Sequence, residues 1–145
     1  MSAMAGRLIH AVARAIDGTA ALLGRSGRAA HLETGARGEE EAYFYLRRLG
    51  YAMVARNFRS PRRRGEIDLI GYDGEVLCFI EVKTRTTRAV MPAEAAVDQD
   101  KQRDLIAVAD EYVRRLKSAP PTRFDVVSVY FEGGKPEITL FKGAF

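Results

Sequence analysis

The chain has 145 residues, of which 47% are hydrophobic and 29% are charged, so it is long enough for one domain with a buried core. No uninterrupted apolar run approaches the roughly 18–20 residues of a membrane span, and we therefore expect no membrane insertion. The chain holds one cysteine and two histidines, which excludes an internal disulfide, argues against a zinc site and favours a cytoplasmic protein.

The N-terminal region is rich in alanine, glycine and arginine. Apolar residues recur at four-residue spacing from Leu8, which predicts a short amphipathic helix interrupted by glycines. Residues 1–31 carry four arginines and one aspartate, and so account for +3 of the formal net charge of +4. We therefore divide the chain into an appendage of residues 1–33, helical or flexible, and a domain of residues 34–145.

A second helix is predicted for residues 35–49, where apolar side chains recur on one stripe and Glu39 stands at the start of the buried face. A strand follows over residues 51–58, and a basic segment comes after it. Either this segment is a solvated loop or it binds the phosphates of a nucleic acid, because it leads directly into an acidic hairpin. Its five arginines are Arg56, Arg59, Arg62, Arg63 and Arg64.

Two apolar strands joined by Asp73-Gly74 predict a β-hairpin over residues 66–83. With Asp73 and Gly74 as the central turn residues, Asp68 faces Phe79 and Glu66 faces Glu81. Asp68 and Glu81 are then diagonal neighbours on one face, with α-carbons roughly 7–8 Å apart. The single cysteine, Cys78, lies on the other, apolar face, which predicts a core residue.

Carboxylates on adjacent strands repel each other unless something positive lies between them. Asp68 and Glu81 therefore predict a site for a hard divalent cation held by oxygen ligands, Mg²⁺ or Mn²⁺, with Glu66 as a further ligand. Lys83 follows Glu81 by two residues and so points the same way. The alternatives are that the carboxylates are solvated or salt-bridged, that Glu66 binds a neighbouring arginine, and that Lys83 only pairs with a carboxylate.

The rest of the chain predicts a helix over residues 99–117, capped by Asp98, and then strands over 123–131 and 137–141. Lys101 lies in the first turn on the inward stripe of this helix, where it would reach a phosphate or Glu81; otherwise its stem would pack and its amine would extend to the solvent. Arg123 and Asp125 are predicted to form an architectural ion pair. Since the helix follows one strand and precedes another, it should cross over to a parallel partner in a mixed sheet.

Several short motifs together resemble the YraN-like family of bacterial proteins, a branch of the PD-(D/E)XK nuclease superfamily related to archaeal Holliday-junction resolvases. Ile67 replaces the proline that precedes the aspartate in the superfamily, and Asp98 stands where relatives tend to have Ser or Thr. The resemblance covers residues 35–131 and rests on Gly38-Glu39, Asn57-Phe58-Arg59, Gly65 to Ile70, Phe79 to Arg85, Lys101-Gln102 and Arg123 to Val127.

The resemblance implies a restriction-endonuclease-like α/β fold, a mixed sheet flanked by helices in the order αβββαββ. It implies a Mg²⁺-dependent endonuclease acting on DNA, at branched or junction structures, and a homodimer by analogy with junction-cleaving relatives. Glu39 matches the helical acid of resolvase-like members, although a first-turn glutamate is also favoured by the helix dipole. The catalytic set would be Asp68, Glu81, Lys83 and Glu39; the metal ligands Asp68, Glu81, Glu39 and Glu66; and the nucleic-acid contacts Arg56, Arg59, Arg62, Arg63, Arg64, Arg85 and Lys101.

Two other functions remain open at this point. A nucleic-acid-binding module with a nuclease fold would bind in a salt-sensitive way without cleaving, although the complete set of acids and lysine argues against it. An interaction protein would use residues 1–33 to recruit a partner, with the acidic motif serving a structural role.

Overall fold

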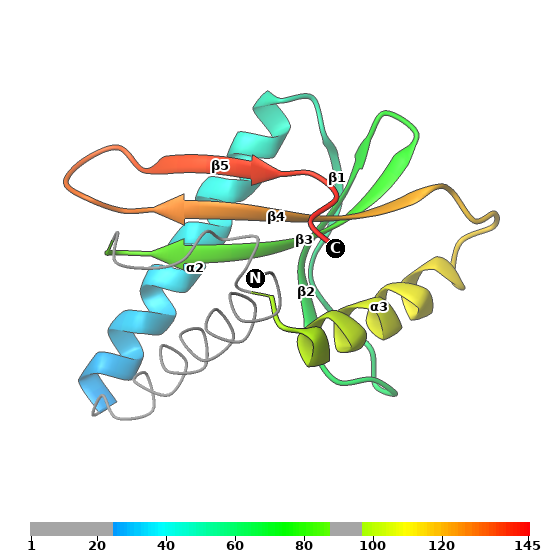
Figure 1. Cartoon of the computed structure of the whole chain (residues 1–145), viewed down its shortest axis with the longest axis horizontal. Helices are drawn as coiled ribbons and strands as arrows, with labels where there is room; N and C mark the ends of the chain where they lie inside the picture. Colours follow the sequence, from blue (N-terminus) through cyan, green and yellow to red (C-terminus); the bar gives the residue numbers. More distant parts are fainter. Residues whose placement is uncertain (1–24, 88–96) are drawn as a thin grey trace, which may run out of the picture.

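A single five-stranded mixed sheet forms the centre of the molecule, as a computed structural model of residues 25–87 and 97–145 shows. The strands lie in the order β1-β2-β3-β4-β5, and only β3 and β4 run parallel (Figure 1). The predicted restriction-endonuclease-like α/β class and the order αβββαββ are confirmed. The elements are α2 (Arg25–Arg48), β1 (Ala52–Arg59), β2 (Glu66–Asp73), β3 (Val76–Arg85), α3 (Gln99–Val113), β4 (Thr122–Tyr130) and β5 (Glu137–Phe141).

Each face of the sheet is covered by one helix, because side chains alternate along the central strands. Ala42 and Leu46 of α2 pack in one cluster with Ile80 of β3, while Leu105 and Val108 of α3 pack in a second cluster with the neighbouring Phe79. The cysteine at position 78 is buried in the α2 cluster, which confirms its prediction as a core residue. No helix within the described residues is long and apolar enough to cross a bilayer.

The helices differ in length from their predictions. Helix α2 begins at Arg25, ten residues before the predicted start, and Gly27 lies inside it. A glycine inside a helix lowers the stability of that helix by only about 1 kcal/mol relative to alanine, so it does not by itself end the helix. Helix α3 ends at Val113 rather than at residue 117. Of the predicted appendage, residues 1–24 lie outside the described residues, and the division at residue 33 stays a prediction.

The register predicted for the β2–β3 hairpin was wrong by two residues. Asp73 pairs with Val76, so the two central turn residues are Gly74 and Glu75. Gly74 adopts φ +61°, and hairpin turns of type II′ favour glycine at the first central position. Because the shift is an even number, the side chains of the paired residues keep their faces. Ile67, beyond the last pair, packs with Phe79 rather than with Ile80, so the alternation of β2 changes beside Asp68.

A polar network holds the turn end of the hairpin to the segment after β5. Arg123 contacts Asp125 at 2.7 Å and Asp73 at 2.8 Å, which confirms the predicted ion pair and adds a partner to it. Asp125 is buried, and it also accepts a hydrogen bond from the Gly143 amide at 2.9 Å. These contacts satisfy the buried charge of Asp125, and they give this network an architectural role.

Helix α2 approaches β3 closely at one glycine. A β-carbon added at Gly38 would lie 2.0 Å from Oγ1 of Thr84 and 3.0 Å from its β-carbon. Only a glycine therefore allows the helix to lie this near the strand. The contact also brings Glu39, the next residue, towards the segment of β3 that carries Glu81 and Lys83.

Gly38→Ala is expected to destabilise the fold by about 1–3 kcal/mol, because the added methyl group overlaps Thr84 and the helix must move. Gly35→Ala is the matched control, since the space around Gly35 is open; it should stabilise the same helix by roughly 0.5–1 kcal/mol. Urea unfolding followed by circular dichroism measures both. Equal stability of the two variants would contradict the close approach.

Candidate active site

The acidic site lies where the β2–β3 ladder ends. Paired residues of the two strands run as far as Leu69 and Ile80. Asp68 comes just before the last paired residue of β2, and Glu81 just after the last paired residue of β3, so both acids lie where the ladder ends. The backbone N–H of Val82 donates to Oδ2 of Asp68 at 2.8 Å, so the Asp68 side chain accepts the hydrogen bond of a strand amide at this point. The charge of Glu81 acts on Asp68 at the position where the strands separate.

Glu81 is a buried carboxylate held between two lysines. Its residue is 5% exposed, and Oε1 contacts Nζ of Lys101 from α3 and lies 3.7 Å from Nζ of Lys83. A buried charge needs such partners, because an unpaired one would cost several kcal/mol. Of the alternatives predicted for Lys101, the structure contains the contact with Glu81. Lys83 also makes the carboxylate contact that was predicted as its alternative role.

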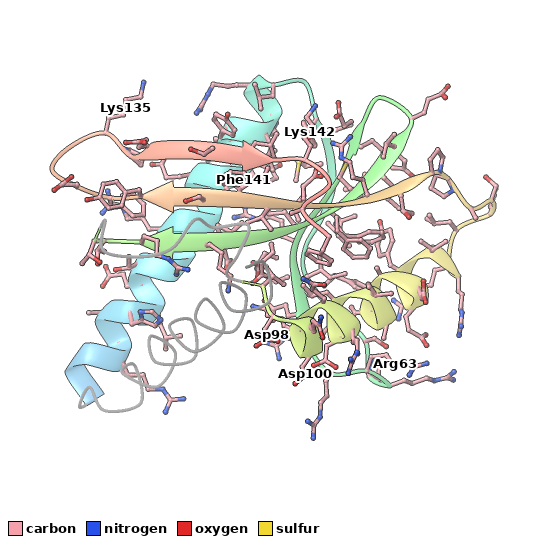
Figure 2. All side chains as sticks on the ribbon, viewed as in Figure 1. Arg63, Asp98, Asp100, Lys135, Phe141 and Lys142 are labelled. Carbon is pink, nitrogen blue, oxygen red and sulfur yellow. The ribbon has the colours of Figure 1, made fainter. Side chains whose placement is uncertain are left out.

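The position of Lys101 follows from the way α3 begins. Asp98 caps the helix and accepts a hydrogen bond from the Lys101 amide at 2.8 Å, which confirms the predicted cap. Gln102 Nε2 donates to the Val97 carbonyl at 3.0 Å and closes the same turn. Figure 2 shows Asp98 at the start of this helix, beside the sheet. The first turn is thus fixed, and its lysine reaches the strand that carries Glu81.

Glu39 of α2 and Glu66 of β2 form a second pair of acids, joined by an asparagine. With the Asn57 amide nitrogen turned towards them, it donates to Glu66 Oε1 at 3.0 Å and to Glu39 Oε2 at 3.1 Å. Glu66 also forms an ion pair with Arg59, which was the alternative predicted for it. Asn57 had not been predicted as a site residue. The available signal was its type, since asparagine is depleted inside strands.

The charges of these acids act on one another. Burial and the neighbouring charge of Glu81 raise the pKa of Asp68 to about 8, although the hydrogen bond from Val82 opposes the shift. Burial, with Glu66 and Glu81, raises the pKa of Glu39. Burial alone would lower the pKa of Lys101, but the charge of Glu81, the hydrogen bond to it and the charge of Asp68 together outweigh this effect and raise the pKa. The site therefore carries more negative charge than its lysines neutralise.

The donor chemistry of the site fits a hard divalent cation, because carboxylate oxygens are the ligands that Mg²⁺ and Mn²⁺ prefer. In the described part of the chain, however, no three His, Cys, Asp or Glu side chains are already arranged as a cation-binding group. Glu81 is turned to Lys101 instead. Binding a cation would thus require the lysine to release Glu81 and the acids to turn inwards.

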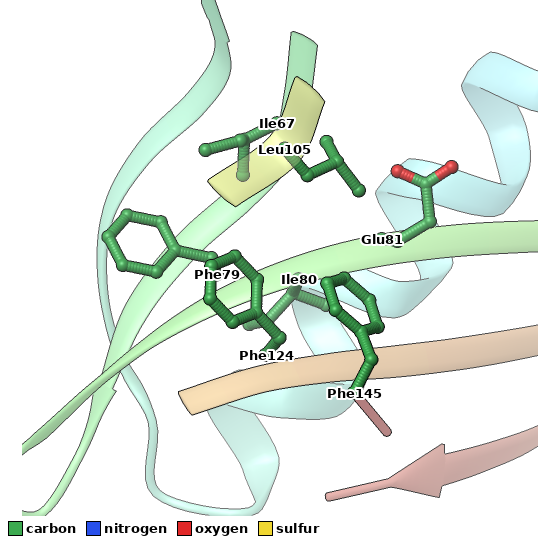
Figure 3. Close-up of a pocket in the computed structure, with 7 residues that line it drawn as sticks. All are labelled: Ile67, Phe79, Ile80, Glu81, Leu105, Phe124 and Phe145. Carbon is green, nitrogen blue, oxygen red and sulfur yellow. The ribbon is translucent and has the colours of Figure 1, made fainter. Parts of the chain in front are cut away.

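An apolar wall lies on one side of Glu81. The side chains around it come from β2, β3, α3, β4 and the segment after β5 (Figure 3). Phe124 stacks on Phe79 with ring centroids 5.5 Å apart and on Phe145 at 4.9 Å. This packing leaves no room for a water molecule, so Glu81 is shielded from solvent on that side.

The predicted nucleic-acid contacts separate into several groups. Arg59 pairs with Glu66, Nε of Arg63 lies 3.7 Å from Glu111 of α3, and Arg56 lies over the ring of Tyr43. Arg85 donates to the carbonyl of Thr84 at 3.5 Å. Arg62 and Arg64 are exposed in the loop between β1 and β2. Part of the basic segment therefore stabilises the fold, and part of it lies on the surface beside the acids.

Comparison with known proteins gives a family but no activity. The sequence model of the Uncharacterised protein family UPF0102 matches residues 38–129. A UPF0102 protein of Koribacter versatilis is 59% identical over 115 residues, which cover 79% of this chain and 80% of the relative. A UPF0102 protein of Solibacter usitatus is 45% identical over 109 residues, covering 74% and 82%. One of Symbiobacterium thermophilum is 50% identical over 96 residues, covering 66% and 80%.

The raised pKa of Asp68 predicts how stability depends on pH without a cation. The folded state binds this proton more tightly than the unfolded state, so the stability that the protonated side chain contributes is fully present below the ordinary aspartate pKa of 3.8 and is lost as pH rises through about 8. In EDTA, the unfolding free energy of Asp68→Asn should therefore rise relative to that of the unsubstituted protein between about pH 4 and about pH 8, and the difference should level off above that range.

Urea unfolding at a series of pH values measures this difference. Glu75→Gln is the matched control, because Glu75 is exposed at the turn of the same hairpin, and it should show no such trend. If the difference between Asp68→Asn and the unsubstituted protein stayed constant over this range, the crowding of Asp68 by Glu81 would be refuted.

Proposed function

We propose that this chain, which belongs to the Uncharacterised protein family UPF0102, is a Mg²⁺- or Mn²⁺-dependent endonuclease that hydrolyses phosphodiester bonds in DNA. The observation that carries the proposal is the proximity of Asp68 and Glu81 at the end of the β2–β3 ladder, with Lys83 two residues further along β3. This combination stands in a mixed sheet whose element order is consistent with restriction-endonuclease-like folds. A crowded, partly neutralised group of acids further supports a site for a cation.

Asp68 and Glu81 would hold the cation, with Glu39 and Glu66 as additional ligands. When bound, the cation lowers the pKa of a coordinated water and polarises a phosphoryl oxygen. Lys101 would leave Glu81 and so become available to a phosphate oxygen. Lys83, which stays beside Glu81, would orient the water or neutralise charge on the phosphate. The apolar wall of Phe79 and Phe124 would exclude bulk water from one side of Glu81.

The substrate class is supported by charge. Arg62 and Arg64 are exposed in the loop that leads into Glu66, so a phosphate backbone bound there would pass beside the acids. A preference for branched or junction DNA, and a homodimer that cuts two strands, are proposed by analogy with the resolvases that the sequence resembles. A dimer would place two such sites on one junction.

A second candidate is a nucleic-acid-binding module that does not cleave. The contacts of Lys101 and Lys83 with Glu81 favour it, because they satisfy the buried carboxylate without any metal. This candidate predicts binding through the same arginines and no dependence on divalent ions. The two functions are therefore separable by one cleavage experiment.

Purified protein, incubated with labelled four-way junction, flap, single-stranded and duplex DNA, is expected to cleave in Mg²⁺ or Mn²⁺ but not in EDTA. Asp68→Asn and Glu81→Gln should each lower the cleavage rate by about 10²-fold or more, since each removes a charge that supports the reaction. Glu75→Gln should cleave as the unsubstituted protein does. Full activity of Glu81→Gln would reject its role, and binding without cleavage on every substrate would favour the second candidate.

Replacing Arg62 and Arg64 by alanine should weaken DNA binding and reduce the dependence of log affinity on log salt by about 1 for each lost phosphate contact. Lys135→Ala is the control, because this exposed lysine lies in the β4–β5 turn, at the far side of the molecule from Arg63 (Figure 2). Fluorescence anisotropy over a range of salt concentrations measures both. An unchanged salt slope would exclude these arginines from the interface.

A further inference from the structure

Asn57 has an unusual backbone conformation for a residue in the middle of a strand. Its φ is +50°, and no other non-glycine residue of the described ranges has a positive φ. Left-handed conformations are unfavourable for residues with a β-carbon, but asparagine tolerates them better than most. Burial also stops alternating here, because Arg56 and Asn57 are both exposed. The strand is therefore deformed at this residue.

The deformation directs the Asn57 side chain to the acids. Arg56 pairs with Leu69 and Phe58 with Ile67, so Asn57 lies across from Asp68 on the neighbouring strand. Its amide nitrogen contacts carboxylates from two different elements, Glu66 at 3.0 Å and Glu39 at 3.1 Å. Both neighbours are acceptors, so the nitrogen and not the oxygen must face them. One amide group thus joins α2 to β2 beside Asp68.

Joining these acids has a physical consequence. Two carboxylates that share a site repel each other and would separate if nothing lay between them. A neutral amide with two donors can bind both of them without adding charge. Arg59 also neutralises Glu66, but it lies further along β1 and is largely exposed, whereas Asn57 contacts both acids.

We propose that Asn57 is a positioning residue that holds Glu39 and Glu66 together beside Asp68, so that both acids stay within reach of a divalent cation. This inference rests on the proposed function, because it assigns a role in the same cation site. Asparagine suits the position for two reasons, since it tolerates the left-handed backbone and carries two amide donors. A purely structural residue would need only the first property.

Asn57→Gly separates the two properties. Glycine adopts a φ of +50° freely, so the strand keeps its shape while the amide is lost. The affinity for Mn²⁺, measured by isothermal titration calorimetry on the full chain, should fall by about 10–100-fold, as for other residues that orient ligands. The melting temperature in EDTA should change little. In a Glu39→Gln background, Asn57→Gly should cause a smaller further loss, because one of the acids through which it acts has lost its charge.

Glu40→Gln is the matched control for Glu39→Gln, since Glu40 is the exposed neighbour on the same helix, and it should leave Mn²⁺ affinity unchanged. Unchanged Mn²⁺ affinity of Asn57→Gly would overturn the positioning role and leave the proposed nuclease intact. Equal losses in the two backgrounds would also overturn it, because Asn57 would then act independently of Glu39. If the unsubstituted protein bound neither Mn²⁺ nor Mg²⁺, the proposed function and this inference would fail together.

Discussion

The buried carboxylate of Glu81 is the constraint on which the arrangement of the site depends. It lies on the central strand β3, where a buried side chain must be either apolar or a charge that is paired with an opposite charge. Lys101 supplies the charge, and it reaches Glu81 because Asp98 and Gln102 fix the first turn of α3. The crossover helix is therefore joined to the sheet at one end by an ion pair, and along its length by Leu105 and Val108. The apolar wall and the acidic site share this one carboxylate.

The acids of the site come from parts of the chain that no short segment brings together. Asp68 and Glu81 meet through the hairpin, while Glu39 arrives from α2, which Gly38 allows to lie close to β3. Asn57, on the edge strand, links Glu39 to Glu66. Asp68 is held by a strand amide, Glu81 by lysines, and Glu39 and Glu66 by one neutral amide group. These contacts bring four acids from three elements together in the folded chain.

Much of the fold could be predicted because it depends on local pattern. The alternation of residues along β3 predicted which side chains lie on each face of the sheet. Asp98 predicted the start of α3, and the position of this helix between two strands predicted that β3 and β4 are parallel. The hairpin register could not be predicted from Asp73-Gly74 alone, since the dipeptide fits two turn positions and only the pairing of Asp73 with Val76 distinguishes them. Contacts between residues distant in the sequence could not be predicted either. Arg63 contacts Glu111 of α3, and no residue near Asn57 in the sequence indicated that it would contact Glu39 and Glu66.

The irregular edge strand β1 has a consequence for how the protein behaves at high concentration. A sheet edge presents free backbone groups to which another chain can add, and proteins limit this with bulges and with charged side chains. Strand β1 has a register irregularity between Met53 and Ala55, a left-handed residue at position 57, and exposed arginines at 56 and 59. The distortion that turns an amide towards the acids thus also makes this edge a poor template for aggregation. Selection for colloidal solubility and selection for the site act on the same few residues.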